Sequence, residues 1–177
     1  MPKLIAIPSF VLAVMLVIST PLGAQTCRSE AQIPSSTPTA AFVDHGDGTV
    51  TDSRTGLMWM KCPLGLSGAG CATGSAQAYT WRQALEAAQG SRFAGYDDWR
   101  LPNIKELSSL VERRCYGPAI NLEVFPGMGG DKSYVWSSSP GANDSDGAWN
   151  VEFKYGFSAG IFNRDYAFGL RLVRSGQ

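Results

Sequence analysis

The sequence predicts an α+β fold on three observations: the order of the predicted elements, the signals at the ends of two helices, and an even number of cysteines. Segments with strand character come first, two helices follow in the middle, and strands return near the C-terminus. Strands grouped apart from helices are typical of α+β proteins rather than of alternating α/β proteins. We therefore expect two helices packed on antiparallel β-sheet and stabilised by disulfides.

Residues 1–24 are predicted to be an export signal. Lys3 precedes an almost wholly apolar run from residue 4 to residue 18, and residues 21–24 supply small side chains before a cleavage site. This is the pattern of a secretory signal peptide. A membrane anchor is the alternative, but the apolar run is short and Pro8 interrupts it. We expect export to the periplasm, the cell surface or the medium, without stable membrane insertion.

Removing 24 of the 177 residues leaves 153, which is enough for one domain with its own core. The full chain has 15 basic and 15 acidic residues, and losing Lys3 leaves 14 against 15. A near-neutral chain has no overall electrostatic attraction for nucleic acid or anionic membranes. Residues 25–41 are rich in proline, serine and threonine, so we expect an N-terminal arm that leads into a domain over residues 42–177.

Four cysteines follow the predicted signal: Cys27, Cys62, Cys71 and Cys115. An even number in an exported protein favours two disulfides. Three pairings are possible, and the spacing favours Cys62 with Cys71 across a glycine-rich loop, which leaves Cys27 to join Cys115. A metal site is the alternative, but the chain has no Cys-x-x-Cys pair and a single histidine. We expect no metal and no other cofactor.

Turn chemistry locates the first strands. Phe42–Asp44 and Thr49–Asp52 flank His45-Gly46-Asp47-Gly48, which predicts a hairpin. A buried strand is expected next, at residues 57–60.

Two capping-box patterns predict the helices. Thr80 is followed three residues later by Gln83, with Gly90 as the stop, and Asn103 is followed by Glu106. Apolar side chains then repeat on one face of each helix: Trp81, Ala84, Leu85 and Ala88 in the first, and Ile104, Leu107, Leu110 and Val111 in the second. Both stripes are expected to face the core.

The last third combines strand patterns with a mixture of aromatic and short polar side chains. Apolar and polar residues alternate over residues 149–155, which predicts a half-buried strand with Asn150, Glu152 and Lys154 facing solvent, and residues 168–173 predict a closing strand. Such mixtures also form binding surfaces, although turns and strands need many of the same residues. The predicted ligand-binding residues are Asn150, Glu152, Lys154, Tyr155, Phe157, Phe162, Asn163, Arg164 and Tyr166.

Several ordered motifs resemble those of a known family. Residues 42–52 and 54–59 look like its opening signature, and residues 95–107, Gly-Tyr-Asp-Asp-Trp-Arg-Leu-Pro-Asn-Ile-Lys-Glu-Leu, look like its central one. Residues 136–139, Trp-Ser-Ser-Ser, and the pair Val173-Arg174 complete the pattern. From about residue 42 to residue 174, the chain thus resembles the C-terminal domain family of the Legionella collagen-like (Lcl) adhesin. The resemblance implies a fold similar to C-type lectin-like domains and to sulfatase-modifying factors.

The family's name-giving adhesin binds sulfated glycosaminoglycans, and its collagen stalk supports trimerisation. This chain has no collagen-like Gly-x-y run and is nearly neutral, so neither property is carried over. Trp149-Asn150 is similar to the Trp-Asn-Asp element of calcium-dependent lectins, but Val151 stands where the ligating Asp would be. Calcium among Asp44, Asp47 and Asp52 is an alternative, although hairpin turn chemistry explains the same residues.

Three functions remain, from different classes. The first is an exported, adhesin-like binding module without enzymatic activity, which presents loops near residues 127–150 and 156–168 to an extracellular glycan or protein. The second is a structural or assembly subunit of a cell-surface or oligomeric complex, which buries the same loops against identical subunits or a surface appendage. The third is an enzyme. A catalytic triad would need His45, the single histidine, which lies in a predicted turn. Acid–base catalysis would need a carboxylate pair from residues such as Glu106, Glu112 and Glu123.

Overall fold

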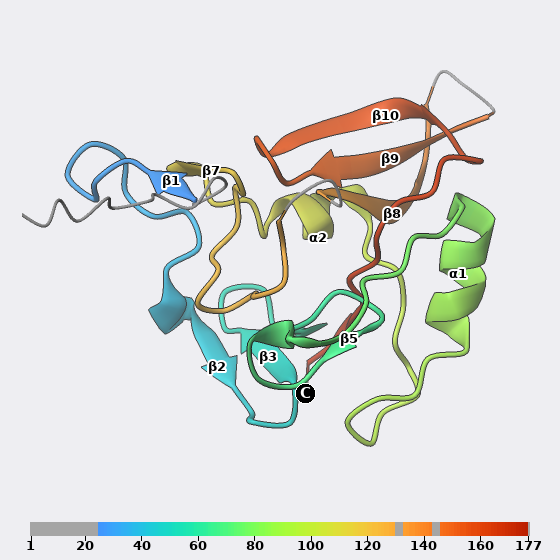
Figure 1. Ribbon diagram of the computed structural model, residues 1–177, viewed down its shortest axis with the longest axis horizontal. Coiled ribbons are helices and arrows are strands. Elements are labelled where there is room, and N and C mark those ends of the chain that lie inside the picture. Colours follow the sequence, from blue (N-terminus) through green and yellow to red (C-terminus); the bar gives the residue numbers. More distant parts are fainter. Residues whose placement is uncertain (1–24, 130–132, 143–145, 177) are drawn as a thin grey trace, which may run out of the picture.

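The computed structural model describes residues 25–129, 133–142 and 146–176, so the predicted export signal lies outside the described residues. Strands, two helices and strands follow one another along the chain, which confirms the α+β class. A three-stranded and a four-stranded antiparallel sheet lie apart, with both helices beside the three-stranded one (Figure 1). No helix in these ranges is long and apolar enough to cross a membrane.

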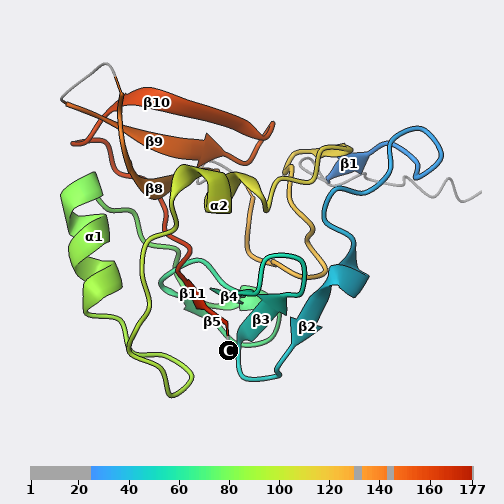
Figure 2. The same cartoon turned by 180° about the vertical axis from the view of Figure 1, so that it is seen from behind.

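The four-stranded sheet contains the predicted hairpin. Its strands are β2 (Phe42–Asp44), β3 (Thr49–Asp52), β4 (Leu57–Met60) and β11 (Val173–Ser175), in the order β11-β4-β3-β2. Figure 2 shows β11 beside β4. The hairpin register pairs Asp44 with Val50 and Phe42 with Asp52. The hairpin and the buried strand β4 are therefore confirmed.

The closing strand predicted at residues 168–173 is only three residues long and begins at Val173. The preceding residues change partners along the chain. Gly169 exchanges backbone hydrogen bonds with the three-stranded sheet, through the Tyr134 carbonyl and the Trp136 amide. Leu170 and Leu172 instead accept from the amides of Leu64 and Met60, at 2.9 and 3.1 Å. The segment thus ties the two sheets together, and for that reason it does not form one continuous strand.

The three-stranded sheet contains β8 (Tyr134–Pro140), β9 (Gly147–Glu152) and β10 (Phe157–Asn163), with β9 in the middle. The strand predicted over residues 149–155 ends earlier, at Glu152, because the chain turns back there. The Gly156 amide donates to the Glu152 carbonyl at 2.8 Å, and Gly156 has φ +80°, which favours glycine. Residues 158–163, expected to be loop, belong to β10 instead.

Both helices begin at their predicted caps. Helix α1 (Trp81–Gln89) has a complete capping box between Thr80 and Gln83, and helix α2 (Ile104–Ser108) has one between Asn103 and Glu106. Helix α2 is shorter than its apolar stripe suggested. Leu110 and Val111 lie beyond its end but are still buried, in the same core cluster as Leu107.

Both predicted disulfides are confirmed. Cys27–Cys115 joins the short strands β1 (Thr26–Cys27) and β7 (Cys115–Tyr116). Cys62–Cys71 closes a nine-residue separation that includes β5 (Leu66–Ser67) and the 3-10 turn η2 (Ala69–Cys71). Strand β6 (Thr73–Gly74) pairs with β5.

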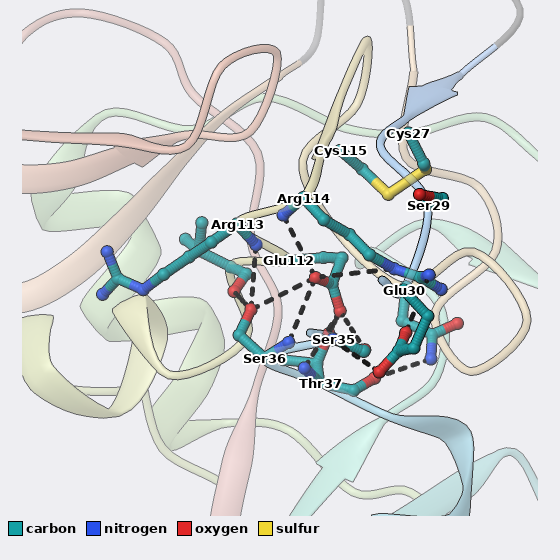
Figure 3. A network of polar contacts seen from close by, with 12 residues as sticks. Cys27, Ser29, Glu30, Ser35, Ser36, Thr37, Glu112, Arg113, Arg114 and Cys115 are labelled. Carbon is teal, nitrogen blue, oxygen red and sulfur yellow. Dashed lines mark hydrogen bonds and ion pairs between the residues drawn. A yellow bond between two sulfur atoms is a disulfide. The ribbon is translucent and has the colours of Figure 1, made fainter. Parts of the chain in front are cut away.

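Residues 25–41, expected to be an arm, pack onto the domain and include the 3-10 turn η1 (Thr39–Ala41). The Glu112 carboxylate accepts hydrogen bonds from Ser35, Ser36 and Thr37 (Figure 3), and Thr37 is fully buried. Burial of Glu112 opposes its ionisation, but these hydrogen bonds outweigh it and lower its pKa to about 2. An ionised carboxylate therefore fastens the arm beside the Cys27–Cys115 disulfide.

Buried side chains form two core clusters. One includes Leu107, Phe125 and Phe153, and the other includes Trp99 and Trp136. Arg171 is fully buried, with its guanidinium 4.9 Å from the centre of the Phe125 ring and a hydrogen bond of 2.7 Å to the Met60 carbonyl. Burial lowers the pKa of Arg171 to about 9.

Candidate functional site

The predicted ligand-binding residues lie on β9, on β10 and in the turns at the two ends of β10. Phe157 pairs with Glu152 and Phe162 pairs with Ala148. Because Glu152 and Ala148 are four residues apart on one strand, Phe157 and Phe162 lie on the same face of the sheet. Their separation along β10 is roughly 13–17 Å at about 3.3 Å per residue. The predicted residues therefore form two groups at opposite ends of one strand.

The first group lies at the turn between β9 and β10. The rings of Tyr155 and Phe157 have their centres 6.3 Å apart, and both rings are exposed. The Lys154 ammonium lies 5.2 Å from the centre of the Tyr155 ring. Glu152 is half-buried and accepts a hydrogen bond from the Ser133 hydroxyl at 3.1 Å. This end of β10 thus presents two aromatic rings with a cation beside them.

The second group belongs to a larger aromatic cluster. Phe162 lies 5.9 Å from Tyr166 and 5.5 Å from both Tyr134 and Phe168, between ring centres. Tyr166 is stacked on Phe168 at 6.0 Å and is exposed, whereas Phe162 is half-buried. Phe162 therefore supports the exposed Tyr166 ring rather than presenting its own face fully.

Arg164 connects the end of β10 to helix α1. Its guanidinium lies 4.4 Å from the centre of the Trp81 ring, and its Nε donates to the Gly147 carbonyl at 3.0 Å. The neighbouring Asn163 is exposed and accepts a hydrogen bond from the Asp165 amide at 2.8 Å. Half-buried and engaged on two sides, Arg164 has a structural role that the sequence pattern did not indicate.

The prediction that Asn150 faces solvent is wrong. Asn150 is fully buried, its Nδ2 donates to the Ala159 carbonyl at 3.2 Å, and its Oδ1 has no partner among the described residues. The alternation argument assumed that one face of the strand is open to water. Strand β9 is instead central in its sheet, and the adjacent residues Asn150 and Val151 are both buried, so both faces are covered at this point.

The alternation over residues 149–155 would put Tyr155 on the same face as Val151 and Phe153, although Tyr155 was also a predicted ligand-binding residue. It lies in the turn and is exposed. Ile161 was not predicted to belong to the surface, yet it is the most exposed large hydrophobic side chain among the described residues. Its position inside a strand could have been inferred only by extending the alternation of β10 through a stretch that looked like a loop.

The carboxylates considered for catalysis or metal binding form hydrogen bonds or ion pairs within the domain. Glu106 forms two hydrogen bonds of 2.7 Å with Arg100, which lower the pKa of its carboxyl group, and Glu123 accepts from Thr39 at 2.7 Å. Asp44 pairs with Lys61 at 2.6 Å, whereas Asp52 lies at the opposite end of the hairpin. Within the described ranges, no group of three or more His, Cys, Asp or Glu residues is placed to hold a metal ion.

The chain is thus a small disulfide-bonded α+β domain with an exposed aromatic surface on one edge strand. Residues 48–174 match the Lcl C-terminal domain, and the chain belongs to that family. The resemblance inferred from the sequence motifs is thereby confirmed. No curated protein matches the chain significantly. The similarity to C-type lectin-like folds stays a prediction.

Proposed function

We propose that this domain is an exported binding module, without enzymatic activity, that contacts a glycan or protein ligand through the β10 surface. We define the β10 surface by its exposed side chains: Lys154, Tyr155, Phe157, Ile161 and Tyr166. One observation carries the proposal. Among the described residues, seven large hydrophobic side chains are exposed, and four of them belong to this surface, with exposed fractions between 52% and 77%.

Grouped exposed hydrophobic side chains indicate an interaction surface, whereas single ones are ordinary. Tyrosine is also enriched among the residues that contribute most to binding energy. The β10 surface places aromatic rings on a strand paired with β9 and in the turns at its two ends. Preorganised side chains lose little conformational freedom when a ligand binds, which favours affinity.

Charge favours a neutral ligand. Around β10, the acidic residues Asp146, Glu152 and Asp165 outnumber the basic residues Lys154 and Arg164, and Arg164 is engaged by Trp81 and Gly147. A surface of this charge lacks the positive potential that attracts sulfated polymers. The two disulfides support export, since disulfides persist in oxidising compartments outside the cytosol.

A glycan array that carries both neutral and sulfated glycans tests this proposal. We expect neutral glycans to be retained by the wild-type domain, and the variant Phe157→Ser/Ile161→Ser/Tyr166→Ser to lose them. The matched control is Val43→Ser, because this side chain is 53% exposed and lies on β2, in the four-stranded sheet. A signal confined to sulfated glycans, or retained by the triple variant, would contradict the proposed ligand and surface.

Assembly is a second candidate function, favoured by the position of β10. This strand is at the edge of its sheet, with β9 as its only neighbour among the described strands. Edge strands with exposed apolar side chains are prone to pair with another chain. Sedimentation equilibrium separates the two functions. An oligomer of the wild-type domain that dissociates in the triple variant, together with an array on which nothing binds, would favour assembly.

A further inference from the structure

A second feature that could hold a ligand is a cavity formed by segments that do not include β10. It has a volume of about 560 Å³ and is lined by the β2–β3 turn, the loop closed by Cys62–Cys71, the segment after α1, and Pro126. This volume lies within the range of small-molecule sites, about 300–1,000 Å³. None of its lining residues belongs to β8, β9 or β10.

The walls of the cavity are apolar. The side chains that give it this character are Met60, Pro63, Leu64, Leu66, Phe93 and Pro126. Met60 and Pro63 are buried, whereas Leu64, Leu66 and Phe93 are half-buried. The last three are therefore partly accessible to a molecule that enters the cavity, and they offer both aliphatic and aromatic contact.

Charged side chains of both signs also line the cavity. Asp44 and Lys61 form an ion pair of 2.6 Å and neutralise each other. Asp47 accepts hydrogen bonds at one carboxylate oxygen, Oδ1, from the Thr49 amide and hydroxyl at 2.9 and 2.6 Å. Its other oxygen accepts none from the described residues. Arg92 is exposed, and its closest acidic group is Asp97 at 3.9 Å. One carboxylate oxygen and one weakly paired guanidinium are thus available.

The cavity is held in shape by its own backbone. The Lys61 amide donates to the Gly48 carbonyl at 2.9 Å, and the Leu64 amide donates to the Leu170 carbonyl at 2.9 Å. Gly48, with φ +91°, lies so close to Phe93 that a Cβ there would be 2.7 Å from its ring. The disulfide fixes the remaining wall. A site formed before the ligand arrives loses little conformational freedom on binding.

We propose that this cavity binds a small zwitterionic molecule with an apolar body, of the class of the apolar α-amino acids. The ammonium group of the ligand pairs with Asp47, its carboxylate pairs with Arg92, and its side chain lies against Leu66 and Phe93. Both charges of an α-amino acid are on its Cα, at one end of the molecule. Asp47 and Arg92 are the chain neighbours of Gly48 and Phe93, which are in contact, so both charges lie at one part of the cavity while the apolar walls face the side chain of the ligand. This site is separate from the β10 surface and does not depend on the function proposed for it.

Isothermal titration with L-leucine and L-phenylalanine, each alone as a probe, tests the proposal. We expect saturable binding of both, and weaker binding of L-phenylalanine methyl ester and N-acetyl-L-phenylalanine, which each lack one charge. Partly exposed ion pairs are worth up to about fivefold in affinity, so Asp47→Asn and Arg92→Gln should each weaken binding about three- to fivefold. The matched control Asp165→Asn removes an exposed carboxylate outside the cavity and should change nothing.

The triple variant of the β10 surface should bind both amino acids as the wild-type domain does, which separates this site from the proposed function. If neither amino acid binds the folded domain at millimolar concentration, the cavity does not have this ligand. If the ester and the acetylated compound bind as tightly as the free amino acid, the charged groups are not recognised. Either result would overturn the proposal.

Discussion

Two buried residues test the core: Leu107, on the predicted apolar stripe, and Trp99, in the central motif of the family. Leu107 is fully buried, and Trp99 is almost so, with its Nε1 donating to the Phe93 carbonyl at 3.0 Å. Large-to-small substitutions in a core cost about 2–5 kcal/mol. We expect Leu107→Ala and Trp99→Ala each to lower the free energy of unfolding in urea by this amount. If both variants unfold at the wild-type denaturant midpoint, neither residue belongs to the core.

Glu112 gives the domain a dependence on pH. Its pKa in the folded domain is about 2, below its ordinary value of 4.5, so the stability that it contributes is present above pH 4.5 and is lost as the pH falls toward 2. We expect Glu112→Gln to destabilise the domain at neutral pH and to flatten the loss of stability over this range. Urea unfolding at a series of pH values measures both effects. Glu123→Gln, which removes an exposed carboxylate with one Thr39 contact, is the control.

At the scale of elements, short sequence motifs correctly predicted the helix starts and the hairpin, because contacts between residues close in sequence determine these features. The capping boxes at Thr80 and Asn103 and the turn of the β2–β3 hairpin depend on residues within a few positions of one another, and all three are confirmed. The ends of β9 and β11 depend on distant partners. Gly156, for example, packs so closely on Val111 that a Cβ there would be 2.6 Å from it. No pattern within residues 149–155 contains that information.

The N-terminal arm shows the same limit. Its composition indicated a linker, but Glu112 and the Cys27–Cys115 disulfide, both more than 70 residues away in sequence, fasten it to the domain. The disulfide was predicted from the cysteine spacing, whereas the Glu112 contacts are clear only once the chain has folded.

The arm also yields a prediction. In the chain-entropy model, a disulfide that closes a long loop contributes roughly 4–5 kcal/mol, and Cys27 and Cys115 are 88 residues apart. We expect Cys27→Ser/Cys115→Ser to lower the melting temperature and to expose residues 25–41 to limited proteolysis, with Cys62–Cys71 intact. A variant whose arm stays as resistant as that of the wild-type domain would show that the Glu112 contacts suffice to hold it.

For the whole molecule, the sequence predicted the region of the candidate site better than its residues. Tyr155, Phe157 and Tyr166 are exposed as a ligand surface requires, whereas Asn150 is buried and Ile161 was missed. Exposure depends on which strand is central and which is at the edge, and strand order cannot be inferred from the alternation of one strand. The cavity beside Phe93 was not predicted, because segments from four parts of the chain meet there.

The central claim is that the β10 surface binds the ligand. The most direct measurement is the dissociation constant of the strongest glycan from the array for three proteins: the wild-type domain, Phe157→Ser/Ile161→Ser/Tyr166→Ser, and the control Val43→Ser, with the melting temperature of each. Loss of several contact residues that dominate affinity weakens binding by about tenfold or more. We predict that loss for the triple variant alone, with all three melting temperatures nearly equal. Equal affinities for the triple variant and the wild-type domain, or an equal loss in the control, would contradict the claim.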